Sequence, residues 1–182
     1  HVRSDSCAAR VNINSAGNVY VLSSTGRVVL GADDASSFHL AADFQDTRAQ
    51  TGFTKLHISN NGSIWASGGA MSIEGSWASI ATSSSDTALA YRLDRYYLSD
   101  IFVKSDNTII AVGSMMDSYN IGGRNDGGKA GVVLISKNKG KDWSVVYRSN
   151  QSSEFTSIVQ LSISNYLIVG TNGEVVSLIH KY

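Results

Sequence analysis

The chain has 182 residues, 42% of them hydrophobic, and its 15 basic and 15 acidic residues give a formal net charge of zero. This composition, with a mean hydropathy of -0.06, is typical of a soluble folded domain and excludes a disordered chain. The balanced charge offers no overall attraction to nucleic acid or to an anionic membrane, and no apolar run reaches the roughly 18 residues that a membrane-spanning helix needs.

Cysteine usage indicates the compartment. Cys7 is the only cysteine, which excludes an intrachain disulfide and a zinc site built on several cysteines. With no visible signal peptide, the chain fits a reducing compartment, and we expect a cytoplasmic protein. Because the sequence begins with His1 instead of Met, removal of a leader or a tag is the alternative that stays open. The four histidines show no metal-ligand spacing, and no cofactor is expected.

Short alternations of apolar and polar residues, separated by clusters of Gly, Asn, Asp and Ser, predict β-strands joined by turns throughout the chain. In the first stretch we expect strands near residues 10–14, 18–22, 27–30 and 37–41. In the second they fall near residues 54–59, 63–68, 77–82 and 87–93, and in the third near residues 98–104, 108–113, 131–136 and 143–148. The last group falls near residues 156–163, 166–170 and 174–180 and has no fourth strand.

These groups repeat one pattern in register: an apolar pair with one residue between its members, a short polar turn, and a second such pair. The first pair falls at Val11/Ile13, Leu56/Ile58, Ile101/Val103 and Ile158/Gln160. The second falls at Val19/Val21, Ile64/Ala66, Ile109/Ala111 and Tyr166/Ile168. The first two steps are 45 residues long and the third is 57. Strand-rich repeats of this length predict the blades of a propeller.

The fold that we expect is therefore all-β and β-propeller-like, with about four short antiparallel blades in a single domain over residues 1–182. The repeats cover approximately residues 9–52, 53–97, 98–154 and 155–182. A ring of four blades is small, so two alternatives stay open: the chain is part of a larger propeller, or two chains complete one ring. Residues 1–8 are expected to supply the missing outer strand of the last blade and so close the ring.

The turn between the last two strands of the third repeat carries a motif. The run Ser136-Lys137-Asn138-Lys139-Gly140-Lys141-Asp142-Trp143 resembles the Asp-box, Ser/Thr-x-Asp-x-Gly-x-x-Trp, of the sialidase-type β-propeller superfamily. Asn138 stands in place of the aspartate, and its side chain is expected to accept hydrogen bonds from backbone N–H groups. Gly140 is expected to take a positive φ and Trp143 to pack beneath the turn. In that superfamily the box is structural, so the resemblance implies a fold and no active site.

Sialidase chemistry is not expected from this chain. The resemblance would imply three arginines on a substrate carboxylate, a tyrosine nucleophile with a glutamate partner, an aspartate acid/base and six blades. The arginine motif of that family includes a proline, and this chain has none. Its arginines also fall at no matching position. We expect a non-enzymatic protein, and a sialidase-like glycosidase is the third alternative.

The long insertion of the third repeat, residues 114–130, is predicted to form a binding surface. In a propeller its loop lies on the same face as the connection 94–97 and opposite the Asp-box turn. Tyr, Arg and Met are enriched at protein interfaces. The predicted partner-binding residues are Arg95, Tyr96, Tyr97, Met115, Met116, Asp117, Tyr119, Arg124 and Asp126. The competing interpretation is a solvated glycine-rich loop beside a tyrosine pair that seals the blade edges.

The function that we expect is binding of another protein, with no nucleic acid and no membrane as partner. From the general character of the chain, and from no motif, it is further expected to be an immunity or inhibitor protein that neutralises a toxin. The alternative is a glycan-binding lectin. In that case Trp65, Trp77, Tyr20 and Tyr91 would stack on sugars, although no aromatic residue recurs at the same position in every repeat.

Overall fold

A computed structural model describes residues 8–14, 16–31, 36–44, 52–59, 62–72, 75–84, 87–104, 108–116 and 129–179. These residues form fifteen β-strands and one short 3-10 turn, Thr171–Gly173. None of the described helical structure is long and apolar enough to span a membrane.

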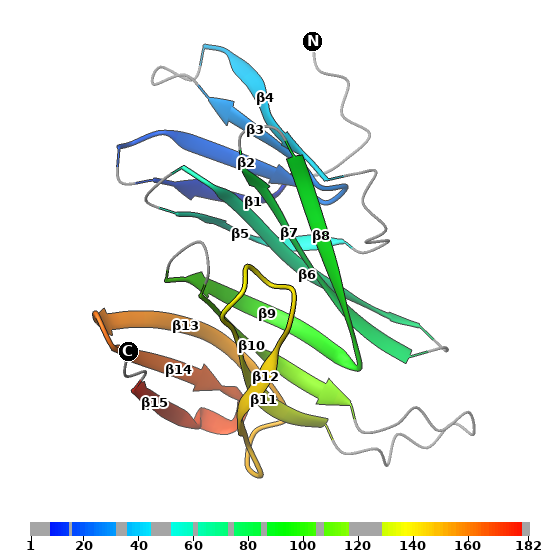
Figure 1. Cartoon of the computed structure of the whole chain (residues 1–182), viewed down its shortest axis with the longest axis vertical. Coiled ribbons are helices and arrows are strands. Elements are labelled where there is room, and N and C mark those ends of the chain that lie inside the picture. The colour runs from blue at the N-terminus through cyan, green and yellow to red at the C-terminus, as the bar shows by residue number, and fades with distance from the viewer. Residues whose placement is uncertain are drawn as a thin grey trace.

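The strands form four antiparallel sheets, one for each sequence repeat (Figure 1). The first sheet contains β1 (Ala8–Ile13), β2 (Val19–Ser23), β3 (Arg27–Gly31) and β4 (Phe38–Asp43). The second contains β5 (Phe53–Ile58), β6 (Ile64–Ser72), β7 (Gly75–Ser84) and β8 (Thr87–Asp94). The third contains β9 (Tyr96–Val103), β10 (Ile109–Met116), β11 (Lys129–Ser136) and β12 (Ser144–Arg148). The fourth contains β13 (Phe155–Ser162), β14 (Asn165–Gly170) and β15 (Val175–Ile179).

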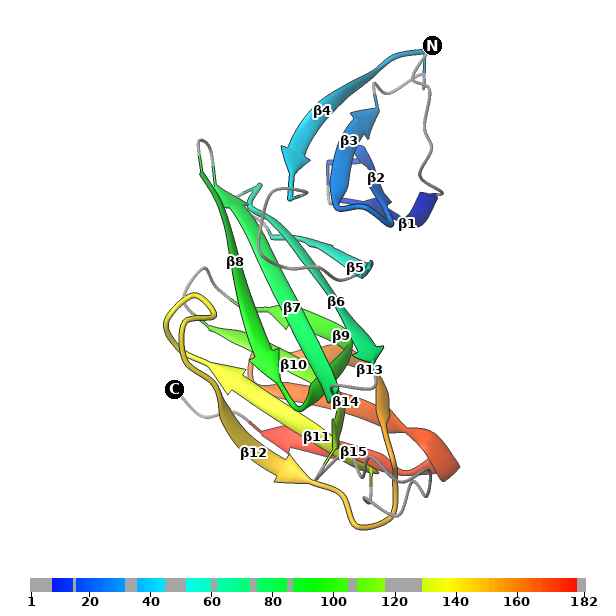
Figure 2. The same cartoon turned by 90° about the vertical axis from the view of Figure 1, so that its right-hand side faces the viewer.

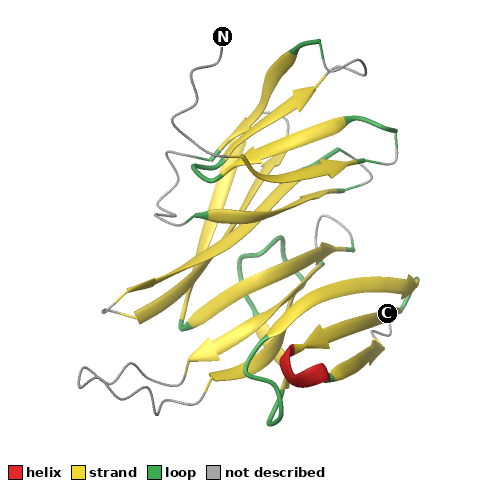
Figure 3. Ribbon diagram, turned by 180° about the vertical axis from the view of Figure 1, so that it is seen from behind, coloured by secondary structure: helices red, strands yellow, loops and turns green. Residues whose placement is uncertain are grey.

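The expected fold class is confirmed: the protein is all-β and propeller-like, with four antiparallel blades. Each of the fifteen predicted strands overlaps an observed strand, and the strand order within every sheet follows the chain. Figure 3, coloured by secondary structure, shows how little of the described chain lies outside strands. This regular order arises because alternating apolar residues bury one face of each short strand. Turns rich in Gly, Asn and Ser then reverse the chain, so that each strand pairs with the one before it.

In Figures 1 and 2 the first sheet lies at the top of the molecule, the second lies below it, and the third and fourth lie together in the lower part. Extensive contacts join each sheet to the next in sequence. The described residues therefore form an open series of blades. The predicted ring closure by residues 1–8 falls largely on residues 1–7, which lie outside the described residues. Ala8 belongs to β1 in the first blade.

Three apolar clusters fill the seams between consecutive blades. We call the side of a blade that meets the following blade its forward face, and the side that meets the preceding blade its rear face. At the first seam, Tyr20 and Leu22 of the first blade pack with Leu56 and Ala66 of the second. The other two seams are built in the same way, from Trp65 and Ile80 with Ile101, Ala111 and Leu134, and from Ile110 and Val112 with Ile158, Tyr166 and Ile168.

A β-bulge occurs at the same point of the first strand in every blade. The pairing of first and second strands skips one residue at positions 9, 54, 99 and 156, which are separated by the same 45, 45 and 57 residues as the sequence repeat. The strand beside the bulge comes very close at Gly68 and Gly113. A Cβ at Gly113 would lie 1.9 Å from the Tyr97 carbonyl oxygen, and one at Gly68 would lie 2.1 Å from that of Gly52. Glycine is required there because the backbones nearly touch.

Polar side chains join the first strands of neighbouring blades. Arg10 Nε donates to the Thr54 carbonyl at 3.2 Å, and Asn12 Nδ2 donates to the Leu56 carbonyl at 2.9 Å. Further along, the Asp100 carboxylate accepts hydrogen bonds from Ser157 Oγ and from the Ile158 backbone N–H. The first strands are sheet edges, so these bonds satisfy backbone groups that have no strand beside them.

His57 of β5 lies in this region. The ring is half-buried and packs edge-on against Phe102, with ring centroids 5.5 Å apart, and Phe102 packs in turn on Tyr166. Burial lowers the pKa of His57 from its ordinary value of 6.5, and the nearby Asp100 carboxylate offsets part of that shift. The folded protein therefore holds His57 neutral where an unfolded chain would begin to protonate it.

We predict that Gly113→Ala strongly destabilises the fold. The added methyl group meets the Tyr97 carbonyl, so either β9 or β10 must move, and overpacking of this kind costs about 3 kcal/mol. Gly52→Ala is the matched control because nothing lies within 4 Å of its added Cβ. Urea unfolding of both variants checks this, and equal midpoints would contradict the close approach.

We also predict a pH-dependent contribution from His57. Its folded pKa is lowered, so the unfolded state binds more protons below about pH 6.5, and the free energy of unfolding falls as the pH drops through that region. His57→Gln should reduce the loss of stability between about pH 7.5 and about pH 5.5. His39→Gln, on the exposed part of β4, should leave that loss unchanged. A wild-type pH profile in His57→Gln would refute the assignment.

Candidate functional site

The candidate site lies at one end of the strands of the third blade. The connections from β8 to β9, from β10 to β11 and from β12 to β13 all emerge at this end, and we call it the loop edge. The turn that resembles the Asp-box joins β11 to β12 at the opposite end. The loop edge is where the sequence placed the partner-binding residues.

A row of side chains crosses three strands at the loop edge. Tyr96 of β9 lies opposite Met115 of β10, and Met115 lies opposite Ala130 of β11. Cross-strand partners point to the same side of a sheet, so the three side chains are neighbours. Tyr96 and Met115 are half-buried and pack against the apolar cluster between the second and third blades. The two predicted segments, 94–97 and 114–130, therefore meet as expected.

The structure corrects where these residues sit. Tyr96 and Tyr97 were predicted to lie in a loop, but both belong to β9, because each finds a partner on β10. Arg95 alone makes the connection from β8; it is exposed, has φ of 75°, and its backbone N–H donates to the Ser76 carbonyl at 2.8 Å. Tyr97 is half-buried, and its ring lies where a Cβ at Gly69 would come within 2.7 Å. The tyrosine pair is thus part of the seam between blades.

Met116 extends β10 and pairs with Lys129 at the start of β11. The residues between them lie outside the described residues, and so do four of the predicted partner-binding positions, Asp117, Tyr119, Arg124 and Asp126. The described part of the insertion is therefore its two strand ends. The second of these ends, at Lys129 and Ala130, contributes to a pocket that the sequence did not predict.

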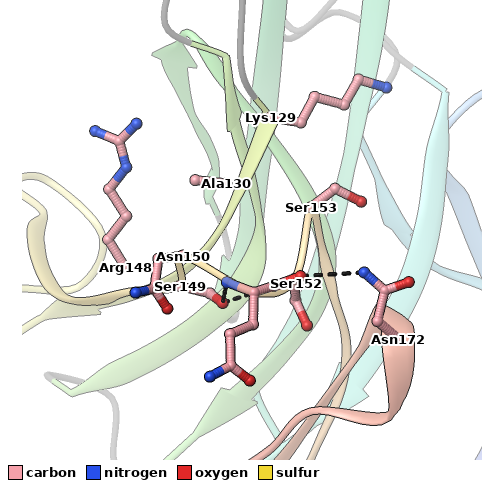
Figure 4. Close-up of a pocket in the computed structure, with 9 residues that line it drawn as sticks. Lys129, Ala130, Arg148, Ser149, Asn150, Ser152, Ser153 and Asn172 are labelled. Atoms are coloured by element: carbon pink, nitrogen blue, oxygen red, sulfur yellow. Dashed lines mark hydrogen bonds between the residues drawn. The ribbon is translucent and has the colours of Figure 1, made fainter.

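A polar pocket of about 390 Å³ lies at the loop edge of the third blade (Figure 4). It is lined by the start of β11, the connection from β12 to β13 and the 3-10 turn, through Lys129, Ala130, Arg148, Ser149, Asn150, Gln151, Ser152, Ser153 and Asn172. Figure 4 shows the Lys129 and Arg148 side chains diverging, with the serine-rich connection between them and Asn172. Ala130 belongs to both the pocket lining and the Tyr96–Met115 row, so the two lie next to each other.

Hydrogen bonds hold the connection 149–153 in one conformation. Ser149 Oγ accepts from the backbone N–H groups of Gln151, at 2.9 Å, and Ser152, at 2.8 Å, and donates to the Glu174 carboxylate. Asn172 has φ of 61°, and its Nδ2 donates to the Gln151 carbonyl at 3.1 Å. The backbone N–H of Gly131 also donates to the Ser152 carbonyl at 2.8 Å. The pocket wall is therefore pre-organised.

Glu174 stands behind this wall as a carboxylate. Hydrogen bonds, foremost the one from Ser149, hold its pKa below the ordinary value of 4.5. Tyr147 OH donates to the same carboxylate at 3.0 Å, which raises the pKa of the phenol. Both groups are hydrogen-bonded to each other, and Glu174 is also hydrogen-bonded to Ser149, so they stabilise the wall of the pocket.

The charge of the pocket lining is positive. Lys129 and Arg148 are both exposed cations, and the other lining residues offer hydroxyl, amide and backbone groups. No carboxylate is among the residues that line the pocket, and the described part of the chain contains no cluster of His, Cys, Asp or Glu that could hold a metal ion. Such a lining can bind a carboxylate or another hydrogen-bond acceptor.

Sequence reasoning missed this pocket. It assigned no role to the connection 149–153, because a run of Ser, Asn and Gln resembles any polar loop. The residues that convert it into a pocket, Glu174 and Asn172, come about 20 residues later in the chain. Only the Thr-Asn-Gly turn at 171–173 was a visible signal, since Asn and Gly tolerate positive φ.

The turn at 136–143 has the local geometry that its motif predicts. Asn138 Oδ1 accepts from the Asp142 backbone N–H at 2.9 Å, and Gly140 has φ of 84°. Ser136 Oγ accepts from the Gly140 backbone N–H at 2.8 Å. Trp143 is half-buried on the adjoining cluster and its Nε1 donates to the Gly140 carbonyl at 2.9 Å. Asn138 Nδ2 also donates to the Asp142 carboxylate at 2.7 Å, a hydrogen bond that an aspartate at this position could not donate.

The aromatic residues considered for sugar stacking lie mainly in the core. Trp65 is 2% exposed and Tyr20 is 7% exposed, so neither offers a face to a ligand. Trp77 is half-buried, and the guanidinium of Arg92 lies 4.6 Å above its ring. These residues therefore do not form an open stacking surface.

No protein-family model and no curated protein sequence matches the chain. Among solved structures, it is similar to YCF48 from Cyanidioschyzon merolae, with 10% sequence identity and a TM-score of 0.44 over 98% of this chain and 69% of that chain. It is also similar to a structure of YCF48 bound to D1 peptide, with 13% identity and a TM-score of 0.44 over 100% of this chain and 67% of that chain. At this identity the likeness concerns the fold alone and assigns no residue of the site.

We predict that Asn138→Asp destabilises the protein by about 1 kcal/mol, because it replaces the hydrogen bond to Asp142 with two facing carboxylates. In an Asp142→Ala background the same change should be nearly neutral, since the side-chain oxygen at position 138 can still accept the hydrogen bond from the backbone N–H of residue 142. A double-mutant cycle by urea unfolding measures the difference. Equal costs in both backgrounds would show that Asp142 does not explain the asparagine.

Proposed function

We propose that this domain is a non-enzymatic protein-binding propeller that holds its partner at the loop edge of the third blade. One observation carries the proposal: the polar pocket between Lys129 and Arg148 adjoins the Tyr96–Met115–Ala130 row, with which it shares Ala130. An apolar strip beside hydrogen-bonding groups and cations is the make-up of a protein-recognition surface.

The partner that fits this surface presents an apolar side chain next to an acidic or carbonyl-rich segment. The apolar group would pack on the row, and the acceptors would meet Lys129, Arg148 and the amides of the pocket. Because the connection 149–153 is already hydrogen-bonded to itself and to Glu174, little ordering entropy remains to be lost on binding. A rigid pocket wall favours binding of one specific partner over weak binding of many different partners.

The finer part of the proposal is an immunity or inhibitor protein that neutralises a toxin partner. It is supported by the size of the domain and by a surface suited to covering a partner, and no motif specifies it. The turn at 136–143 is proposed to be an Asp-box-type structural turn, since its polar groups bond to one another and it lies at the end opposite the pocket. It takes no part in the proposed binding.

Non-enzymatic function is supported by what the pocket presents. Its two cations and its neutral side chains provide hydrogen bonds and charge, and its lining supplies no carboxylate pair for general acid and base catalysis. Glu174 and Tyr147 lie near the pocket and have shifted pKa values, and they are hydrogen-bonded to each other.

The test is affinity capture from native lysate with a charge-reversed pocket. Lys129→Glu with Arg148→Glu should abolish retention of the partner, because both cations at the pocket become anions. Lys137→Glu with Lys141→Glu is the matched control, since it makes the same charge change on exposed residues at the opposite end of the blade. Alanine changes at Tyr96 and Tyr97 are less suitable because both side chains pack within the structure.

The expected result is one stoichiometric protein retained by the wild type and the control and lost from the pocket variant, identified by mass spectrometry. Loss from both variants, or from neither, would contradict a site at the pocket. If no protein is retained while a glycan array shows binding, the lectin alternative replaces the proposal.

A further inference from the structure

Both ends of the blade series expose broad apolar surfaces. The rear face of the first blade presents Val11, Ile13, Phe38 and Leu40, and the forward face of the fourth blade presents Val159, Leu161, Val169, Val175 and Ile179. Apolar faces of this kind are unusual on a monomer in water and mark an interaction surface. The first sheet lies at the top of Figures 1 and 2 and the fourth sheet lies in the lower part.

The sequence repeat shows what these faces are equivalent to. Val11, Leu56 and Ile101 occupy one repeat position on the rear face. Leu56 is 6% exposed and Ile101 is 4% exposed because each packs on the preceding blade, whereas Val11, with no described blade before it, is 56% exposed. Every internal rear face is thus covered, and the first one is not.

The forward faces show the same contrast. Val112 of the third blade is fully buried against the fourth blade. Val169, one repeat later, is 37% exposed, and no described blade follows it. The apolar residues at the two ends therefore resemble the residues of the internal seams, but no described blade packs against them.

The rear face of the first blade is also hollowed. A pocket of about 590 Å³ lies on it, lined by Val21, Arg27, Val29, Phe38 and Leu40. Arg27 pairs with Asp43 at 3.2 Å, so the only cation of the lining is already neutralised. A partner for this face needs apolar side chains and no compensating charge, which is what the forward face of the fourth blade offers.

We propose that two copies of this chain join end to end in a closed ring, with the forward face of the fourth blade of each copy packed on the rear face of the first blade of the other. Every internal seam joins a forward face to a rear face, and the described chain retains one unmatched face of each kind. A second copy supplies both missing surfaces at once. Two copies give eight blades, within the four to eight that propellers use.

The two seams of this ring are identical heterologous contacts, in which different surfaces of the two copies meet. This geometry differs from a dimer in which the same face of each copy meets itself. The difference can be tested because damage to either end should break the assembly, and two differently damaged copies should restore one intact seam when mixed.

The experiment measures molar mass by light scattering after size exclusion, over a range of protein concentrations. The wild type should give twice the chain mass of 19.4 kDa. Leu40→Glu on the rear face of the first blade and Val159→Glu on the forward face of the fourth blade should each give monomers. Val146→Glu, on a similarly exposed position of β12 in an internal blade, is the control and should stay dimeric. Circular dichroism confirms that each variant is folded.

Mixing Leu40→Glu with Val159→Glu should return dimers, because one seam of the mixed pair carries only native residues. Val11→Glu and Val175→Glu repeat the test at a second position on each face. A monomeric wild type would overturn the proposal and leave the faces to further blades or to another protein. A dimer sensitive to one face only would show a self-paired contact, and a series of growing masses would show an open chain of copies; each result overturns the closed ring.

Discussion

Burial of one blade's forward face against the rear face of the next is the interaction on which the rest of the structure depends. A single sheet of three or four short strands has two faces and cannot bury either by itself. At each of the three described seams, one face of a blade is buried against one face of the next blade. Side chains such as Leu22, Ile80, Ala111 and Val133 become fully buried there. The stability of a blade therefore depends on its packing against the neighbouring blades, as in other repeat proteins.

The angle and spacing of the seams are set near the first strands. The bulge that recurs in every blade bends the strand, and the glycines at positions 68 and 113 let the neighbouring backbone approach it. Polar side chains such as Asn12 and Asp100 then satisfy the open edge of the next first strand. Apolar seams provide the driving force, while these directional contacts fix how consecutive blades meet.

The strands could be predicted from the sequence because alternation and turn residues are local signals. The bulges could not, although their positions follow the repeat, because an extra residue shows only when two strands are paired. Tyr96 and Tyr97 were assigned to a loop for the same reason, since they belong to β9 only through their pairing with Met115 and Ser114 on β10. The pocket was missed because it combines β11, the connection 149–153 and Asn172, which are brought together by seam packing between the third and fourth blades.

The two kinds of surface on this molecule follow from the same construction. Sheet faces bury apolar residues and therefore join blades, whereas the ends of the strands carry the polar connections. The pocket between Lys129 and Arg148 lies at such an end, at the junction of two blades that are already packed. Closing the end faces would not cover it, because those faces belong to the first blade and to the far side of the fourth. Assembly and recognition can therefore occur together, and a ring of two copies would present two equivalent pockets to its partners.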